Sequence, residues 1–218
     1  LQGVAAPAYT FAMPGIPGYN PDKLDEYTKY DPKLAMEMLK GTPYEGGKNW
    51  PKITLTQREE GDGPKAAGGA IIQMLKENLG MNMEHEIGES KSTYQRMFNL
   101  EVQLMWLRWY ADYPDPNNQH FMVFYSNKSS GKRQAWANPE FDKLVADAAG
   151  VLDEKKRMAM YAEADKVLAK DAAAIFVYYI QGFTLLKPTV KGWPLNKDGF
   201  FPGTMFREYY RDVYMAKK

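Results

Sequence analysis

The chain has 218 residues, and its 28 lysines and arginines nearly balance its 27 aspartates and glutamates, giving a formal net charge of +1. This balance excludes a strong overall field that would attract nucleic acid or an anionic membrane. The chain contains no cysteine, which excludes disulfides, thiolate catalysis and zinc–sulfur or iron–sulfur sites. Hydrophobic residues make up 44% of the chain, enough for a substantial core, but no apolar run reaches the ~18 residues that span a bilayer.

The first regular elements in the sequence are a short helix and a strand. Asp31-Pro32 supplies a side chain that caps free amides and a proline that suits a first helical turn. Gly41 ends this helix, and one face of it carries the apolar residues Leu34, Ala35, Met38 and Leu39. Residues 53–56 then alternate between aliphatic side chains and threonine, which predicts a strand.

A second helix and a second strand follow directly. Pro64 opens the helix and Gly80 ends it. Its predicted buried stripe consists of Ala67, Ile71, Met74, Leu75 and Leu79. Alternating apolar residues over 81–87 predict the next strand. The order strand, helix, strand indicates a βαβ unit, with two parallel strands joined by a right-handed crossover.

The middle of the chain is aromatic and ends in prolines. Ser90 or Ser92 is expected to cap a short helix around residues 94–98. Residues 102–109 are apolar and aromatic and predict a buried strand. The two prolines that follow it are expected to end regular structure.

The C-terminal half predicts two helices and further strands. Asn138-Pro139 starts one helix, with Phe141, Leu144, Val145 and Ala148 facing inward, and Asp153 caps a longer one, with Met158, Tyr161, Ala162 and Leu168 facing inward. Residues 174–180 are apolar on both faces, which predicts a central strand, and residues 184–186 are expected to pair with it. The tail over residues 205–215 is a candidate last strand. The fold class is therefore α/β, with a mixed, mostly parallel sheet flanked by helices.

Common catalytic motifs are missing from the sequence. His85 falls on a predicted strand and His120 in a predicted polar loop, and two histidines with no shared motif indicate structural or solvent roles. No serine lies in a nucleophile-elbow pattern. The glycines at 61, 63, 68 and 69 lack the lysine and hydroxyl residue of a phosphate-binding loop. We expect no cofactor and no metal.

Two carboxylates are the strongest candidates for chemistry. Asp112 and Asp115 follow the predicted buried strand into a proline-rich loop, and ligands commonly bind at strand ends in α/β sheets. A carboxylate there can act as an acid or base, bind a metal, or pair with a cationic group of a ligand. The alternative is turn chemistry, because aspartate before proline commonly caps nearby amides. A pair of carboxylates also leaves glycoside hydrolysis open.

Aromatic side chains are dense in the same stretch, which contains Trp106, Trp109, Tyr110 and Tyr113. Strand alternation places the two tryptophans on opposite faces, so at least one of them is expected in the core. The other, together with the tyrosines, can wall a groove for peptide side chains or sugar rings. Simple core packing is the alternative.

At these residues the sequence resembles the C-terminal half of the extracellular solute-binding proteins of family 5, the peptide-binding receptors of ABC importers. The resemblance covers roughly residues 20–216 and is carried by four stretches in order: Trp109-Tyr110-Ala111-Asp112-Tyr113-Pro114-Asp115-Pro116; Asn138-Pro139-Glu140-Phe141-Asp142-Lys143-Leu144; Asp153, Arg157, Tyr161, Ala164 and Asp165 at helical spacing; and Lys187-Pro188-Thr189-Val190-Lys191-Gly192.

The resemblance implies a type II periplasmic-binding-protein architecture, in which two lobes close over a ligand. Because the chain opens on Leu1 with no signal segment, we expect a fragment of a longer protein. The predicted division is a connector from a missing N-terminal lobe over residues 1–20, a C-terminal solute-binding lobe over residues 21–200 and a return segment over residues 201–218.

The resemblance also implies site residues. In peptide-binding members, the aspartate that matches Asp112 pairs with the α-ammonium of the ligand, and residues that match Trp109 and Tyr110 contact the peptide backbone. Tyr113 belongs to the same predicted aromatic wall. The family usually has glycine where this chain has Arg108, a basic residue that can pair with a ligand carboxylate or with Asp112 itself.

The expected function is that of a non-enzymatic receptor that delivers solute, in the first place peptide, to a permease in the membrane. The implied location is outside the cytoplasmic membrane, as a periplasmic or lipid-anchored protein, and the fragment is expected to be monomeric with no nucleic-acid partner. Three other interpretations stay open: an oligosaccharide receptor of the same fold, a carbohydrate-active enzyme that uses Asp112 and Asp115, and a sensory lobe that signals without transport.

Overall fold

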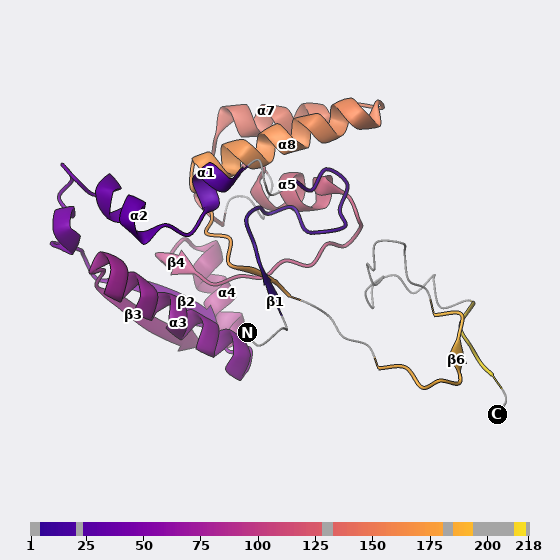
Figure 1. The fold of residues 1–218 in the computed structure, drawn as a ribbon, viewed down its shortest axis with the longest axis horizontal. Coiled ribbons are helices and arrows are strands. Elements are labelled where there is room, and N and C mark those ends of the chain that lie inside the picture. Colours follow the sequence, from indigo (N-terminus) through magenta and orange to yellow (C-terminus); the bar gives the residue numbers. More distant parts are fainter. Residues whose placement is uncertain (1–4, 21–23, 128–132, 181–184, 194–211, 217–218) are drawn as a thin grey trace.

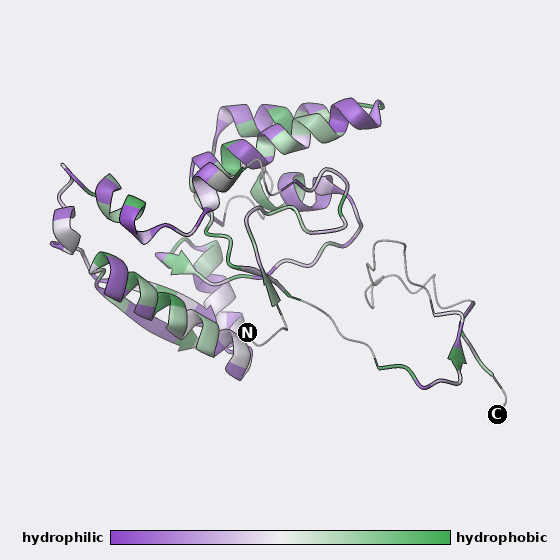
Figure 2. Cartoon of the chain, in the orientation of Figure 1, coloured by the Kyte–Doolittle hydropathy of each residue, from purple (hydrophilic) through white to green (hydrophobic). Residues whose placement is uncertain are grey.

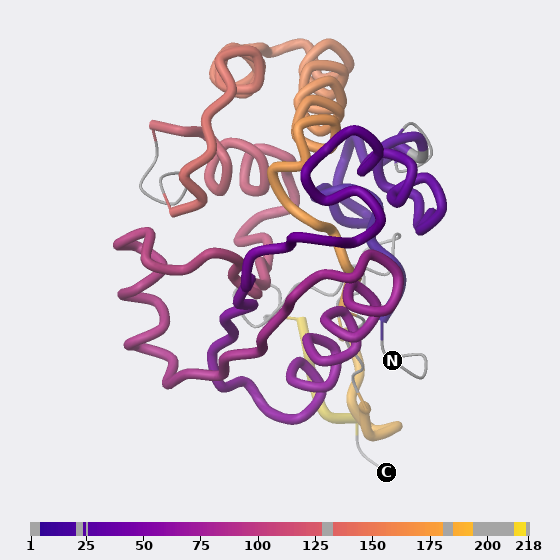
Figure 3. Tube along the Cα trace, turned by 90° about the vertical axis from the view of Figure 1, so that its left-hand side faces the viewer, coloured from indigo at the N-terminus to yellow at the C-terminus, as the bar shows by residue number. Residues whose placement is uncertain are grey.

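The computed structural model describes residues 5–20, 24–127, 133–180, 185–193 and 212–216. Figures 1 and 3 show two layers. One layer contains the parallel sheet and the helices that pack on it, and the other is a group of three helices: α5 (Pro116–Phe124), α7 (Pro139–Ala148) and α8 (Glu154–Lys170). The elements in chain order are β1 (Ala5–Pro7), α1 (Asp25–Thr28), α2 (Pro32–Met38), the 3-10 turn η2 (Glu45–Gly47), β2 (Ile53–Arg58), α3 (Asp62–Leu79), β3 (Met83–Gly88), α4 (Ser90–Phe98), β4 (Leu104–Met105), α5 (Pro116–Phe124), α7 (Pro139–Ala148), α8 (Glu154–Lys170), β5 (Tyr178–Ile180), β6 (Val190–Lys191) and β7 (Tyr214–Met215).

The predicted βαβ unit is confirmed. Strands β2 and β3 are parallel, with Ile53 opposite Met83, and α3 forms the connection between them. Gly80 ends α3 at a φ of 63°, in the left-handed region where glycine has no steric penalty. Strand β4 pairs parallel to the other edge of β2, so the strand order is β3-β2-β4.

The core of this layer lies between the sheet and α3. Its buried members are Leu55, Ile72, Met83 and Trp106. The predicted stripe of α3 is right at Ala67, Ile71 and Leu75, which pack against this core, but wrong at Met74, which is exposed. The face of α3 toward the sheet is rotated so that Ile72 is buried instead. Figure 2 shows hydrophobic residues along α3 interleaved with polar ones.

The short helices begin where capping chemistry places them. The Asp31 side chain accepts a hydrogen bond from the Leu34 amide, and this confirms the predicted start of α2. The prediction that Ser90 or Ser92 caps α4 is wrong, because Glu89 is the cap. Its carboxylate accepts from the amides of Lys91 and Ser92, and these hydrogen bonds lower the pKa of Glu89.

The predicted strand over residues 102–109 is mostly wrong, because only β4 is regular. The amide of Trp106 still donates to the carbonyl of Thr56 at 2.9 Å, which extends the contact with β2 by one residue. Beyond that point the chain turns away from the sheet. The polar groups of Trp109 and Asp112 then bond to a side chain of α5 rather than to a neighbouring strand.

Helix α5 is the largest departure from the sequence prediction. Pro116 begins this helix instead of ending regular structure, and Asp115 caps it by accepting from the Asn117 amide at 2.8 Å. The prediction that His120 lies in a polar loop is therefore wrong. His120 lies on α5 and is 1% exposed, with Nδ1 3.1 Å from the Pro116 carbonyl and Nε2 3.1 Å from Asp165 Oδ1. His85 lies on β3 as predicted.

Helices α7 and α8 begin at their predicted caps. The Asn138 side chain accepts from the amides of Glu140 and Phe141, and Asp153 accepts from the Lys156 amide. Together with α5 they enclose a second core of buried side chains: Val123, Phe124, Phe141, Val145, Ala148, Tyr161, Ala164 and Leu168. The inward residues predicted for these helices are mostly correct, although Leu144, Met158 and Ala162 are only partly buried.

The prediction that residues 174–180 form a central strand is wrong. Only Tyr178–Ile180 is a strand, β5, and it pairs antiparallel with β1 in a two-stranded sheet. Ile175 is 65% exposed, so apolar character on both faces did not mean burial on both faces. The Tyr179 hydroxyl lies 2.8 Å from the Thr10 carbonyl and 2.9 Å from the Ala12 carbonyl, which fastens the N-terminal segment to β5.

The structure describes only part of the C-terminal segments for which the sequence predicts strands. Leu185 and Leu186 are not in a strand, and Thr184 lies outside the described residues. In the predicted tail strand, Tyr214–Met215 forms β7 and pairs with β6, whereas residues 205–211 lie outside the described part. The proposed boundaries at residues 20 and 200 stay predictions, although the segment that contains β1 packs on this lobe through β5.

The helical core predicts a large cost for truncating Phe141, which is 0% exposed and packs edge to face on Trp136 with ring centroids 5.0 Å apart. We expect Phe141→Ala to lower the free energy of unfolding by about 3–5 kcal/mol because it leaves a cavity. Leu152→Ala is the control, since Leu152 is fully exposed and should change stability by less than about 0.5 kcal/mol. Equal urea midpoints for the two variants would contradict this core.

The environment of Tyr179 predicts a dependence of stability on high pH. Burial raises the pKa of Tyr179 to about 12, from an ordinary value of 10.0. The folded state therefore favours the neutral phenol, and its stabilising contribution is complete below about pH 10 and is lost as pH rises toward 12. Urea unfolding between pH 9 and 12 should show a steeper loss in wild type than in Tyr179→Phe, whereas the exposed-ring variant Tyr30→Phe should follow wild type. Parallel curves for wild type and Tyr179→Phe would disprove this role.

Candidate ligand-binding site

The predicted site residues lie on the connection between β4 and α5, which we call the motif loop (residues 106–115). This loop leaves the sheet at the carboxyl end of β4, beside the carboxyl end of the parallel strand β2. In parallel α/β sheets this edge carries the ligand-binding loops, because the strands deliver their following residues to the same side.

One buried amide of α5 organises the motif loop. The Asn118 side chain is 1% exposed, and its Oδ1 accepts from the Trp109 indole at 2.8 Å and from the Asp112 amide at 3.2 Å. Its Nδ2 donates to Asp112 Oδ2 at 3.0 Å. Both the backbone and the carboxylate of Asp112 are therefore fixed relative to Trp109 by a single residue.

The two candidate carboxylates have different surroundings. Asp115 has a structural role: it caps α5 and pairs with the Arg157 guanidinium of α8 at 2.5 Å. This hydrogen bond is the main reason that the pKa of Arg157 is raised. Asp112 is exposed, and among the described residues its Oδ1 accepts no hydrogen bond. Asp112 is thus the carboxylate that can receive a ligand, and Asp115 positions the helix that holds it.

The aromatic residues of the loop divide between core and surface. Trp106 is buried in the sheet core, and Trp109 packs partly against the helical core. Tyr110 is 56% exposed and Tyr113 is 38% exposed, so both present ring surface to solvent. The Tyr113 hydroxyl donates to Asn117 Oδ1 at 2.7 Å, and burial of part of its ring raises the pKa of Tyr113.

Arg108 reaches back to the end of β2. Its Nε lies 3.3 Å from Glu60 Oε2, and its guanidinium lies 5.7 Å from the centre of the Tyr110 ring. The ion-pair partner of Arg108 is thus Glu60 and not Asp112. Glu60 also pairs with Arg58, whose guanidinium lies over the Tyr94 ring at 4.8 Å. A single carboxylate therefore joins two arginines and links the motif loop to β2.

Two residues that hold this site were not identified from the sequence, Asn118 and Glu60. The signal for Asn118 was present: Asp115-Pro116 has the same cap-and-proline pattern as Asp31-Pro32 and Asn138-Pro139, which were interpreted as helix starts. With a helix at Pro116, Asn118 falls in its first turn, directly after the motif. No local pattern pointed to Glu60, because its partner Arg108 lies 48 positions further along the chain.

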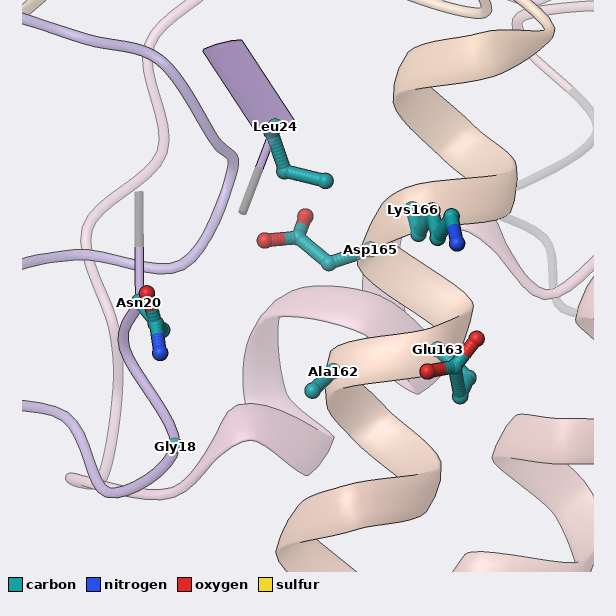
Figure 4. A pocket seen from close by; sticks show the side chains of 7 residues that line it. All are labelled: Gly18, Asn20, Leu24, Ala162, Glu163, Asp165 and Lys166. Atoms are coloured by element: carbon teal, nitrogen blue, oxygen red, sulfur yellow. The ribbon is translucent and has the colours of Figure 1, made fainter. Parts of the chain in front are cut away.

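One pocket of the structure lies away from the motif loop. It has a volume of about 240 Å³ and lies between α8 and the segment that leads into α1. Figure 4 shows Asp165 projecting from α8 toward Leu24 at this pocket. The Asp165 carboxylate lies 3.1 Å from His120 Nε2 and accepts a hydrogen bond from the Phe11 amide at 3.4 Å, so it has a structural role. A second pocket of about 180 Å³ adjoins Glu60 and Arg58, at the end of β2.

The described ranges show neither a metal centre nor a membrane-spanning helix. These ranges contain no group of three or more histidine, aspartate or glutamate side chains arranged to hold a metal ion. Within the same ranges, the helices are too short or too polar to cross a bilayer.

Comparison with known proteins identifies the family. The model described as bacterial extracellular solute-binding proteins, family 5 Middle, matches residues 1–131, which is more than half of the chain. The chain therefore belongs to this family. It is 34% identical over 148 residues to the periplasmic oligopeptide-binding protein OppA of Salmonella typhimurium and 31% identical over 193 residues to the dipeptide-binding protein DppE of Bacillus subtilis. These alignments cover 68% and 85% of this chain, but only 26% and 35% of the relatives.

Solved structures confirm the expected type II periplasmic-binding-protein fold. The murein tripeptide-binding protein MppA of Escherichia coli matches with a TM-score of 0.77 at 23% identity, over 100% of this chain and 42% of that chain. OppA of Haemophilus influenzae, solved in complex with the peptide RPPGFSPFR, matches with a TM-score of 0.73 at 23% identity, also over 100% and 42%. The chain thus spans less than half the length of these proteins.

The hydrogen bonds of Asn118 predict the effect of its removal. We expect Asn118→Ala to lower the free energy of unfolding by about 1–3 kcal/mol, because the Trp109 indole and the Asp112 amide lose their partner. The Trp109 indole N–H resonance should shift in a ¹H–¹⁵N spectrum. The exposed Asn127→Ala serves as the control and should change neither quantity. An unchanged Trp109 signal in Asn118→Ala would contradict the network described above.

Proposed function

We propose that this protein is the solute-binding receptor of an ABC importer and that its solute is a peptide with a free α-ammonium group. The observation that carries the proposal is the Asp112 carboxylate, which is exposed, has one oxygen free of hydrogen bonds among the described residues and is held by Asn118. A fixed anion that is not neutralised by its own fold suits a cationic group of a ligand. Membership of the family, together with relatives whose names include oligopeptide and dipeptide binding, supports the same solute class.

In this proposal different residues of the motif loop bind different parts of the peptide. Asp112 pairs with the ammonium and fixes the register of the ligand, while Trp109, Tyr110 and Tyr113 provide ring surface against the peptide. An extended peptide offers backbone groups as an added strand would, so its affinity can depend little on its side chains. Arg108, bound to Glu60, lies against the Tyr110 ring and helps to position it.

The proposal extends to location and mechanism. The protein acts outside the cytoplasmic membrane, as the names of several relatives indicate for those proteins, and delivers its ligand to a permease. The described chain supplies one lobe, and closure of a second lobe over the motif loop traps the ligand, which stabilises the closed state by its extra contacts. We assign residues 1–20 to the connection between the lobes and residues 201–218 to a return segment.

The same loop allows a second candidate, an oligosaccharide as the solute. Exposed tyrosine rings such as Tyr110 can stack on sugar rings. A carbohydrate-active enzyme is less well supported, because Asp115, the required second carboxylate, is already engaged by Arg157 and by the cap of α5. We propose a binding protein without catalysis.

Asp112 provides the test. Ligands that bind only the folded state raise the melting temperature, so we expect pools of free peptides to stabilise the intact protein. Asp112→Asn should weaken binding by about 2–5 kcal/mol, the usual loss when one partner of a desolvated charge pair is removed. N-acetylation of the peptides should weaken binding to wild type to a similar degree.

The control is Asp147→Asn, which makes the same charge change on an exposed turn of α7 and should bind peptide like wild type. Stabilisation by oligosaccharide pools, with none by peptides, would replace the peptide proposal with the sugar alternative. Peptide binding that is unaffected by both Asp112→Asn and N-acetylation would remove Asp112 from the site.

A further inference from the structure

Arg133 is an arginine beside the motif loop whose charge has no anionic partner among the described residues. It lies between α5 and α7, is half-buried, and its guanidinium is 5.6 Å from the centre of the Trp109 ring. Its Nε is buried and makes no hydrogen bond to any described residue. Desolvation by this burial lowers the pKa of Arg133, so the surroundings act against the charged form.

The other described arginines are different. Arg58 and Arg108 share Glu60, Arg96 forms two hydrogen bonds to Glu86 at 2.5 and 3.1 Å, and Arg157 pairs with Asp115. Of the five arginines in the described ranges, Arg133 alone takes part in no ion pair with a described carboxylate. The residues just before it, 128–132, are Lys-Ser-Ser-Gly-Lys and contain no carboxylate that could supply one.

A half-buried guanidinium without an anion is unfavourable, because it has lost water and gained only a ring contact in return. Such a group is suited to receive an anion from a ligand, since the fold has already removed part of its hydration before binding. A guanidinium also matches the planar geometry of a carboxylate through two parallel hydrogen bonds.

Trp109 contacts both this cation and the Asn118 amide that holds Asp112. Its ring faces Arg133, and its indole N–H shares the Asn118 side chain with Asp112. Trp109 is therefore linked to a cation through its ring and to an anion through Asn118. A peptide in its ionised form carries the complementary pair of charges.

We propose that Arg133 binds a carboxylate of the ligand, either the carboxyl terminus of the peptide or an acidic side chain. The inference rests on the proposed peptide-binding function and narrows the solute to peptides that carry an accessible carboxylate. Arg133 touches the ligand directly in this proposal, and Trp109 holds its guanidinium in place.

Four versions of one short peptide separate the two sources of carboxylate: with and without an internal aspartate, each with a free or an amidated C-terminus. Their dissociation constants are measured by calorimetry with the intact protein as wild type, Arg133→Gln, Arg133→Lys and Arg96→Gln. Arg96→Gln is the matched control, because it removes the same charge from α4, where Arg96 already has Glu86 as its partner.

We expect wild type to prefer one carboxylate-bearing version over the version without any carboxylate by at least about tenfold, a difference of ~1.4 kcal/mol. Arg133→Gln should abolish this preference, Arg133→Lys should keep part of it, and Arg96→Gln should keep all of it. If amidation weakens binding to wild type, Arg133 binds the carboxyl terminus of the peptide. If removal of the aspartate weakens binding, Arg133 binds the acidic side chain.

Two results would overturn the inference while leaving the proposed function in place: wild type binds all four peptides equally, or Arg133→Gln weakens all four to the same extent. The first comparison needs no variant, so it holds even if Arg133→Gln fails to fold. Absence of any peptide binding by wild type would instead overturn the proposed function, and this inference with it.

Discussion

The geometry of the candidate site depends on one buried amide, that of Asn118. Trp109, the Asp112 backbone and the Asp112 carboxylate all bond to it, so the motif loop has a fixed shape although it leaves the sheet after only two residues of β4. Asn118 is itself held because α5 begins at a fixed point, where Asp115 caps the helix and Arg157 anchors that cap to α8. An exposed loop thereby gains the rigidity of the helical core.

The site also joins the two layers of the molecule. Asn118 connects the motif loop to the helical layer, whereas Arg108 and Glu60 connect it to the end of β2 in the sheet layer. Rigid attachment on both sides limits the conformational entropy that is lost when a ligand binds. Such preorganisation suits a receptor in which main-chain contacts and charged groups, rather than tailored side-chain pockets, provide the affinity.

Charge explains how the site can discriminate among ligands. Most charged side chains near the motif loop neutralise one another within the fold, as Glu60 does with Arg58 and Arg108. Asp112 and Arg133 are different, since each keeps a polar group without a partner in the described structure. Under the proposed function, the opposite charges of Asp112 and Arg133 would favour a zwitterionic ligand over a neutral sugar.

The sequence by itself determined the local elements: the caps at Asp31, Asn138 and Asp153, the βαβ unit that ends at Gly80, and the motif that contains Asp112, because each depends on neighbours in the chain. Tertiary structure decided which apolar segment became a strand and which groups were paired. The sequence of residues 174–180 predicts a central strand, but only three of these residues form a strand, which pairs with the distant β1. Likewise the ion pair of Arg108 with Glu60, and the absence of such a partner for Arg133 in the described part of the chain, depend on contacts between distant segments, which local patterns do not encode.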